Sequence, residues 1–367
     1  MRKHVLLLVH GMGAYVTADG KPDETWFNDS VAALKEQYLK YPLVRLKSFE
    51  DAFEIVHVNY DTEIFKLVNR WQTESQAILA TGIPAAAPAE KLVGWLKNAA
   101  KLDNNFAWSH AACVILYRFF PLMRQRIKMA VATQFQKALA ANHEGAVSTW
   151  SVIAHSLGTM VTHDVLQALD STTPNEAGIS ILDAMAPSAN LVAMIANVSK
   201  ILQTDSKVYQ SLVVPQSMIQ NQSACYSYLS ARCEYDPFMR LDPFDPGDLP
   251  AWNLAKSNGS FIDVFTHNIH DLDPHSFRNY IVNPDVHIPL LTKLVGPGAI
   301  TEQEAATARA AFKNIPLATV EQALQDILKK VDPQLAGQSD LDAWFQRAGF
   351  FYAQLKQKQA APPAGTP

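Results

Sequence analysis

Short apolar runs alternate with longer amphipathic stretches over most of the chain. The run HVLLLV (4–9) is apolar almost throughout, and TWSVIAH (149–155) is nearly so, which is typical of strands covered on both faces. The stretches TWFNDSVAALKEQYL (25–39) and SLGTMVTHDVLQAL (156–169) repeat apolar residues at helical spacing. Further strands are predicted at 53–61, 179–187, 224–236 and 260–267. Strands separated by helices predict an α/β fold with a mostly parallel, doubly wound sheet.

Two regions depart from this alternation. Residues 62–146 contain more helical pattern than one connection between strands requires, and residues 188–222 are predicted to form a second, weaker helical insertion. Extra helices between core strands commonly cover the carboxyl edge of the sheet, where ligands bind. The first insertion is rich in aromatic residues, which either pack it onto the core or line an apolar pocket: Trp71, Trp95, Phe106, Trp108, Phe119 and Phe120.

The pattern becomes entirely helical after about residue 298. Thr301 and Glu304 have the spacing of a capping box, which predicts a helix beginning there. Residues 299–357 contain no cluster of chemically reactive side chains, so we expect a docked helical extension. Residues 358–367 include APPAGTP and are expected to be a disordered tail. Residues 1–298 are accordingly predicted to form the core with its two cap insertions.

Composition and charge narrow the class of protein. Of the 367 residues 48% are hydrophobic, and the net charge of -4 offers no basic surface for nucleic acid. No run reaches the ~18 apolar residues that a membrane span requires. The apolar run at the amino terminus is too short for a secretory signal. Three cysteines without a CxxC pair suit a reducing compartment, so we expect a cytoplasmic protein without a transmembrane segment.

The stretch SVIAHSLGTM (151–160) places Ser156 between a predicted strand and a predicted helix. Its neighbours two positions away are Ala154 and Gly158, and only small residues fit around a turn tight enough to expose a serine hydroxyl. Ala154 departs from the stricter glycine, but its methyl group is small. The amide of Leu157 would open the helix, so it could donate to an oxyanion. The spacing therefore predicts a nucleophilic serine.

A second glycine-containing segment follows the first strand directly. It is His10-Gly11-Met12-Gly13, and its glycines allow the sharp turn that would bring the Met12 amide beside the nucleophile. The alternative is a turn that only closes a strand or binds phosphate. The full GxGxxG dinucleotide fingerprint is absent. Together with Ser156, the segment favours a second oxyanion donor.

The combination of VHGMG and AHSLGT resembles the α/β-hydrolase superfamily, specifically the HG-x-G type of lipases and esterases. The resemblance covers roughly residues 3–61 and 147–290, the predicted core strands. It implies an α/β-hydrolase fold in which HG-x-G follows the first strand and the nucleophile comes two strands later. It also implies that an acid and then a histidine follow the serine along the chain, and that no cofactor is required.

A serine hydroxyl needs a base to remove its proton, and the base needs an orienting carboxylate. Asp236 ends a predicted strand and is the preferred acid, whereas Asp183 lies on the strand after the serine, where some similar lipases keep theirs. His275 precedes the helical segment FRNYIV and is the preferred base, with His270 as its alternative.

The histidine-rich segment also permits a metal site. Its possible ligands are His267, His270, Asp271, Asp273 and His275. Their spacing matches no HExxH or comparable array, so no metal is predicted.

These residues predict a serine hydrolase that cleaves small carboxylic esters or lipids through an acyl-enzyme on Ser156. One alternative is a triad hydrolase acting on a thioester, lactone or peptide. The other is a catalytically silent α/β-hydrolase scaffold that serves as a binding module, because one fold hosts many functions.

Overall fold

The structure is a computed structural model. It describes residues 3–11, 21–66, 121–141, 149–169, 188–202, 213–215, 223–236, 243–270 and 273–316, together with the single residues 70, 117, 209, 239 and 319.

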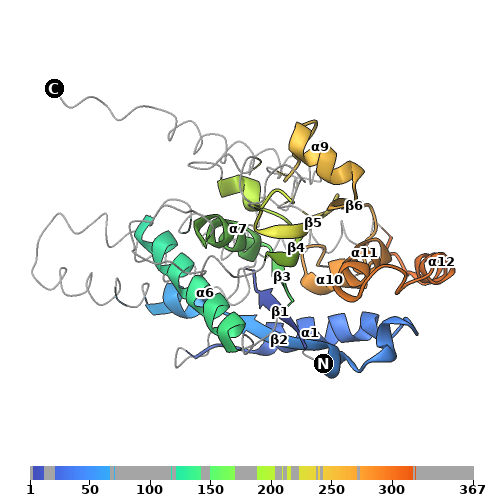
Figure 1. The fold of residues 1–367 in the computed structure, drawn as a ribbon, viewed down its shortest axis with the longest axis horizontal. Coiled ribbons are helices and arrows are strands. Elements are labelled where there is room, and N and C mark those ends of the chain that lie inside the picture. Colours follow the sequence, from blue (N-terminus) through green and yellow to red (C-terminus); the bar gives the residue numbers. More distant parts are fainter. Residues whose placement is uncertain are drawn as a thin grey trace, which may run out of the picture.

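The strands of the described residues form one parallel sheet with the order β2-β1-β3-β4-β5-β6 (Figure 1). Each neighbouring pair is parallel, and β1 lies between β2 and β3. The strands are β1 (His4–Val9), β2 (Phe53–Val58), β3 (Trp150–His155), β4 (Ala189–Ile195), β5 (Cys225–Cys233) and β6 (Phe261–Thr266). All carboxyl ends therefore meet at one edge of the sheet, where segments distant in sequence come together.

Helices cover the central strands, which explains their apolar composition. Every residue of β1 and β3 is buried. In Figure 1 the helices α6 (Pro121–Ala141) and α7 (Leu157–Leu169) lie on one side of the sheet. The other side carries α1 (Thr25–Tyr38), α10 (Phe277–Val282) and α11 (Pro284–Val295). The remaining helices are η1 (Val44–Leu46), α2 (Phe49–Ala52), η3 (Ser199–Leu202), α9 (Pro250–Ser257) and α12 (Glu302–Ala311).

Most elements predicted from the apolar pattern are confirmed. The predicted strands at 4–9, 53–61, 149–155, 224–236 and 260–267 correspond to β1, β2, β3, β5 and β6. The predicted capping box is present. The Glu304 amide donates a hydrogen bond to the Thr301 hydroxyl, and the Thr301 amide donates one to the Glu304 carboxylate. The mixed α/β class with a parallel sheet is thereby confirmed.

One predicted helical region is wrong over part of its length. The sequence pattern predicts helix over 188–222, but Ala189–Ile195 forms the strand β4. Among the described residues of this range, Ser199–Leu202 is helical and of the 3-10 type. The sequence ANLVAMI is a short apolar run, and periodicity alone does not distinguish a buried strand from a buried helix at that length. The strand predicted at 179–187 lies outside the described residues.

The predicted insertion at 62–146 is described mainly through α6, whose helical form confirms the pattern of residues 121–141. The six aromatic residues named for this insertion lie outside the described residues, as do residues 320–367. No helix of the described residues is long and apolar enough to span a membrane.

A largely buried ion pair joins α6 to α7. The guanidinium of Arg124 donates from Nε and Nη2 to the two carboxylate oxygens of Asp164, at 2.7 and 2.8 Å. The hydroxyl of Tyr117 donates to the same carboxylate at 2.9 Å. Burial raises the pKa of Asp164, whereas the contacts with Arg124 and Tyr117 lower it. The lowering is the larger effect, so the net pKa lies below the ordinary value. Because α7 begins directly after Ser156, the pair fixes α6 to the helix that follows the predicted nucleophile.

Candidate active site

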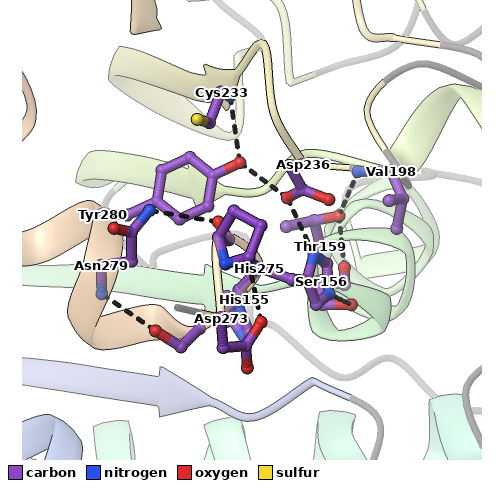
Figure 2. A network of polar contacts seen from close by, with 12 residues as sticks. His155, Ser156, Thr159, Val198, Cys233, Asp236, Asp273, His275, Asn279 and Tyr280 are labelled. Carbon is purple, nitrogen blue, oxygen red and sulfur yellow. Dashed lines mark hydrogen bonds and ion pairs between the residues drawn. The ribbon is translucent and has the colours of Figure 1, made fainter. Parts of the chain in front are cut away.

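Ser156 occupies a strained turn between β3 and α7. Its φ of 52° lies in the left-handed region, which costs a non-glycine residue about 1–3 kcal/mol. Hydrogen bonds to the end of β4 hold this conformation (Figure 2). The Ser156 amide donates to the carbonyl of Ile195 at 3.0 Å. The Thr159 hydroxyl donates to the carbonyl of Ser156 at 2.6 Å and accepts the Val198 amide at 3.0 Å. The turn is therefore fixed by a neighbouring strand.

The two glycine-containing motifs pack against each other with no room for a side chain. A methyl group on Gly158 would lie 2.3 Å from the carbonyl oxygen of His10 and 2.7 Å from that of Val9. A methyl group on Gly11 would lie 2.8 Å from Cβ of Ser156. Real Cβ atoms essentially never approach other atoms so closely, so these positions require glycine. The small residues predicted around Ser156 thus have a steric cause at Gly158.

A neutral histidine organises the turn after β1. His10 is fully buried, and this burial lowers its pKa to about 3. Its Nδ1 donates to the carbonyl of Gly11 at 2.7 Å, and its Nε2 accepts the Tyr60 amide at 3.2 Å. The Tyr60 hydroxyl donates to the carbonyls of both His10 and Gly11. Met12 and Gly13 lie outside the described residues, so the second oxyanion donor stays a prediction.

Ser156, His275 and Asp236 form one hydrogen-bonded chain. The distance from Ser156 Oγ to His275 Nε2 is 2.7 Å, and the distance from His275 Nδ1 to Asp236 Oδ2 is 2.8 Å. At most 1% of each residue is exposed. An ionised carboxylate can only accept a hydrogen bond, so His275 Nδ1 carries the proton and donates a hydrogen bond to Asp236. His275 Nε2 is then unprotonated and can accept the proton of the Ser156 hydroxyl. These are the three residues preferred from the sequence as nucleophile, base and acid.

The backbone of His275 is fixed on both sides of its side chain. Its amide donates to Asp273 Oδ1 at 3.0 Å, and its carbonyl accepts Nε2 of His155 at 2.7 Å. The hydroxyl of Ser276 caps the following helix α10 by accepting the Asn279 amide. His155 is the residue before Ser156, so the strand that leads to Ser156 also positions His275.

Asp236 has a further partner that the sequence did not predict. The hydroxyl of Tyr280 donates to Asp236 Oδ2 at 2.7 Å, and the same hydroxyl accepts the Cys233 amide at 3.1 Å (Figure 2). The Asp236 amide in turn donates to the carbonyl of Cys233 at 3.1 Å. The carboxylate is therefore held at the end of β5 by contacts from both backbone and side chain.

Two forces act on the protonation of His275. Complete burial lowers its pKa, whereas the charge of Asp236 and the hydrogen bond to it raise the pKa, with a smaller contribution from Asp273. The net pKa of His275 lies above the ordinary value of 6.5. The carboxylate thus strengthens the imidazole as a proton acceptor despite the dry surroundings.

The alternative base is placed elsewhere. The imidazole Nδ1 of His270 lies 3.2 Å from the carbonyl of Lys313, and its ring packs near Phe312. His270 is bonded to Asn279 through its backbone amide. The alternative acid Asp183 lies outside the described residues. Of the two histidines, it is His275 whose imidazole contacts Ser156.

The histidine-rich segment does not form a ligand cluster in the described part of the chain. His267 pairs with Glu234 at 2.7 Å on the surface, while Asp273 accepts the His275 amide. No group of three or more potential metal ligands occurs among the described residues.

Comparison with known proteins does not extend this description. No family model, no curated protein and no solved structure matches the chain. The features that bear on function are therefore the α/β fold and the hydrogen-bonded Ser156, His275 and Asp236.

Proposed function

We propose that the protein is a serine hydrolase of the α/β-hydrolase type that cleaves carboxylic esters or lipids through an acyl-enzyme. The observation that carries this proposal is the chain of hydrogen bonds from Ser156 through His275 to Asp236, at 2.7 and 2.8 Å. The order of these residues along the sequence supports it, because α/β-hydrolases have their serine, acid and histidine in that order.

The chemistry divides into two similar halves. Ser156 Oγ attacks the ester carbonyl while His275 Nε2 takes its proton, and Asp236 stabilises the resulting imidazolium. The tetrahedral intermediate then expels the alcohol, which leaves with the proton from His275. Water next attacks the acyl group on Ser156, again losing a proton to His275. Collapse of the second intermediate releases the acid and returns the proton to Ser156.

The oxyanion would form beside the start of α7. Leu157 is the first residue of this helix, and a first-turn amide has no acceptor within its own helix. The positive end of the helix dipole also favours negative charge there. A single oxyanion donor contributes about 10²–10³ in rate. The Met12 amide is proposed as the second donor.

The composition of residues 62–146 bears on the substrate class. The aromatic composition of residues 62–146 favours an apolar acyl or alcohol group, which an ester or lipid would supply. The same triad could act on a thioester, lactone or peptide. A silent scaffold is disfavoured, because it has no need to hold Ser156 at a φ of 52° against a buried histidine.

Covalent labelling tests the proposal directly. A fluorophosphonate probe is expected to form one adduct, at Ser156, because the probe reacts with a serine activated by a neighbouring base. The variant Ser156→Ala should not label. The variant Ser257→Ala is the matched control, since Ser257 is exposed on α9, and it should label like the wild type. Folded wild-type protein that forms no adduct would exclude a serine hydrolase and leave the binding module.

A series of p-nitrophenyl esters of increasing chain length separates the substrate classes. We expect hydrolysis of several members and none by Ser156→Ala. Protein that labels at Ser156 but hydrolyses no member of the series would point to a thioester, lactone or peptide.

The pH dependence of kcat/KM follows from the raised pKa of His275. Protonated His275 cannot accept the serine proton, so activity is lost as the pH falls through this pKa. Because Asp236 raises the pKa, the midpoint should lie above 6.5. A rate profile on a short p-nitrophenyl ester measures it, and a midpoint below 6.5 would contradict the assignment of His275 as the base.

A further inference from the structure

Tyr280 shares one carboxylate oxygen with the proposed base. Its hydroxyl lies 2.7 Å from Asp236 Oδ2, and His275 Nδ1 lies 2.8 Å from the same atom. Figure 2 shows the tyrosine ring beside the aspartate and the histidine. Only 1% of Tyr280 is exposed. The two donors therefore compete, in a dry setting, for the negative charge of one oxygen.

The direction of the tyrosine proton is determined by its other contact. The amide of Cys233 can only donate, and it lies 3.1 Å from the Tyr280 hydroxyl oxygen. The hydroxyl proton is consequently directed at Asp236. Burial and the charge of Asp236 raise the pKa of Tyr280 well above its ordinary value, so the phenol keeps its proton.

We propose that Tyr280 is a positioning residue that sets the proton affinity of His275 by taking part of the charge of Asp236. This inference rests on the proposed function, since it concerns the acid and base of the same reaction. It assigns no contact with substrate to Tyr280, which acts on His275 through the carboxylate.

The fold allows Tyr280 this role because His275 and Tyr280 lie on one short segment of the chain. His275 precedes α10, and Tyr280 lies within α10, whereas Asp236 follows β5. One aromatic ring thus joins the turn that carries the acid to the helix that follows the base. Among the residues that the structure describes, the other titratable groups facing this site are Asp273, His155 and Cys233. Of these three residues, Cys233 contacts the Tyr280 hydroxyl, through its backbone amide.

The variant Tyr280→Phe removes the hydroxyl and keeps the ring. Asp236 then concentrates its charge on His275, so the midpoint of the kcat/KM profile should rise by about 0.5–1 pH unit. At neutral pH a smaller fraction of His275 is neutral, and the carboxylate is less firmly oriented. We therefore expect kcat at pH 7 to fall by roughly 3- to 30-fold, with KM nearly unchanged.

The matched control is Tyr41→Phe. Tyr41 is also a buried tyrosine, and its hydroxyl lies 2.7 Å from Nε2 of His287. This variant loses a buried hydrogen bond of similar length without contacting Asp236 or His275. Its midpoint should equal that of the wild type, which separates a general loss of stability from an effect on the base.

A second variant should shift the midpoint of the pH profile in the opposite direction. It also keeps the hydroxyl, so it does not require that the fold accept phenylalanine at position 280. A fluorinated tyrosine at position 280 keeps the hydroxyl but makes it a stronger donor. It should draw more charge from Asp236 and lower the midpoint. Titration of the His275 imidazole by NMR in the wild type and both Tyr280 variants reports the same shifts without turnover.

The outcomes separate the two proposals. A wild-type protein that does not label at Ser156 would overturn the proposed function. A wild type that labels, together with Tyr280 variants whose midpoints and NMR titrations coincide with the wild type, would overturn only the role of Tyr280. A downward shift in Tyr280→Phe would overturn it equally. Opposite shifts in the two variants would support it.

Discussion

Replacing His275 by alanine is expected to lower kcat/KM for a p-nitrophenyl ester by about four orders of magnitude or more. The Ser156 hydroxyl then has no acceptor for its proton, and Asp236 loses the group that it orients. Because these residues act as a unit, the loss should approach that of Ser156→Ala and should not multiply with it in the double variant. Steady-state kinetics of the two single variants and the double variant measures this.

The control for this prediction is His270→Ala. His270 lies on the same segment, but its imidazole contacts the carbonyl of Lys313 and the ring of Phe312. The variant should retain most of the activity. An inactive His270→Ala beside an active His275→Ala would reverse the assignment of the base.

Replacing Gly158 by alanine is expected to damage both stability and activity. The new methyl group would lie 2.3 Å from the carbonyl oxygen of His10 and 2.7 Å from that of Val9. Both are backbone atoms, so relief requires α7 to move away from β1. We expect a cost of about 3 kcal/mol in the free energy of unfolding. Since α7 begins beside Ser156, labelling by the fluorophosphonate probe should also slow by more than ~10-fold.

Denaturant unfolding and the labelling rate measure the two effects. Gly247→Ala serves as the control, because Gly247 has a positive φ of 55° but nothing within 4 Å of an added Cβ. It should cost only the backbone strain of about 1 kcal/mol and leave labelling unchanged. A Gly158→Ala variant as stable and as reactive as this control would show that the packing around Gly158 is looser than described.

The apolar pattern predicted the strands that are buried on both faces and bounded by turn residues. HVLLLV and WSVIAH have no polar alternation, and both are central in the sheet. β4 was not predicted, although all of its residues except Asn190 are buried. Its seven residues contain Asn190 and no flanking glycine, whereas ISILDAMAP upstream has more of the composition typical of a strand. Tertiary packing, and not local preference alone, decides whether a short apolar run becomes a strand.

The residues of the candidate site that depend on local sequence could be predicted. Ser156 follows from the steric demands of a tight turn, and His275 from its place before a helix. Tyr280, His155 and Thr159 were not predicted, because their hydrogen bonds join residues far apart in sequence or depend on side-chain direction. One signal was available for Tyr280: it lies in the apolar helix FRNYIV, and a buried tyrosine hydroxyl usually has a partner. The sequence alone does not say which partner.

The distances along the chain between the members of the proposed triad have a consequence for biosynthesis. Ser156 and His275 are separated by 119 residues, and Asp236 and His275 by 39. During synthesis the serine leaves the ribosome long before its base exists, and contacts of such range form late in folding. The nascent chain would therefore carry an unreactive serine through most of its assembly. Chemical reactivity at Ser156 would be a property of the finished molecule, and a labelled chain would be one that had completed its folding.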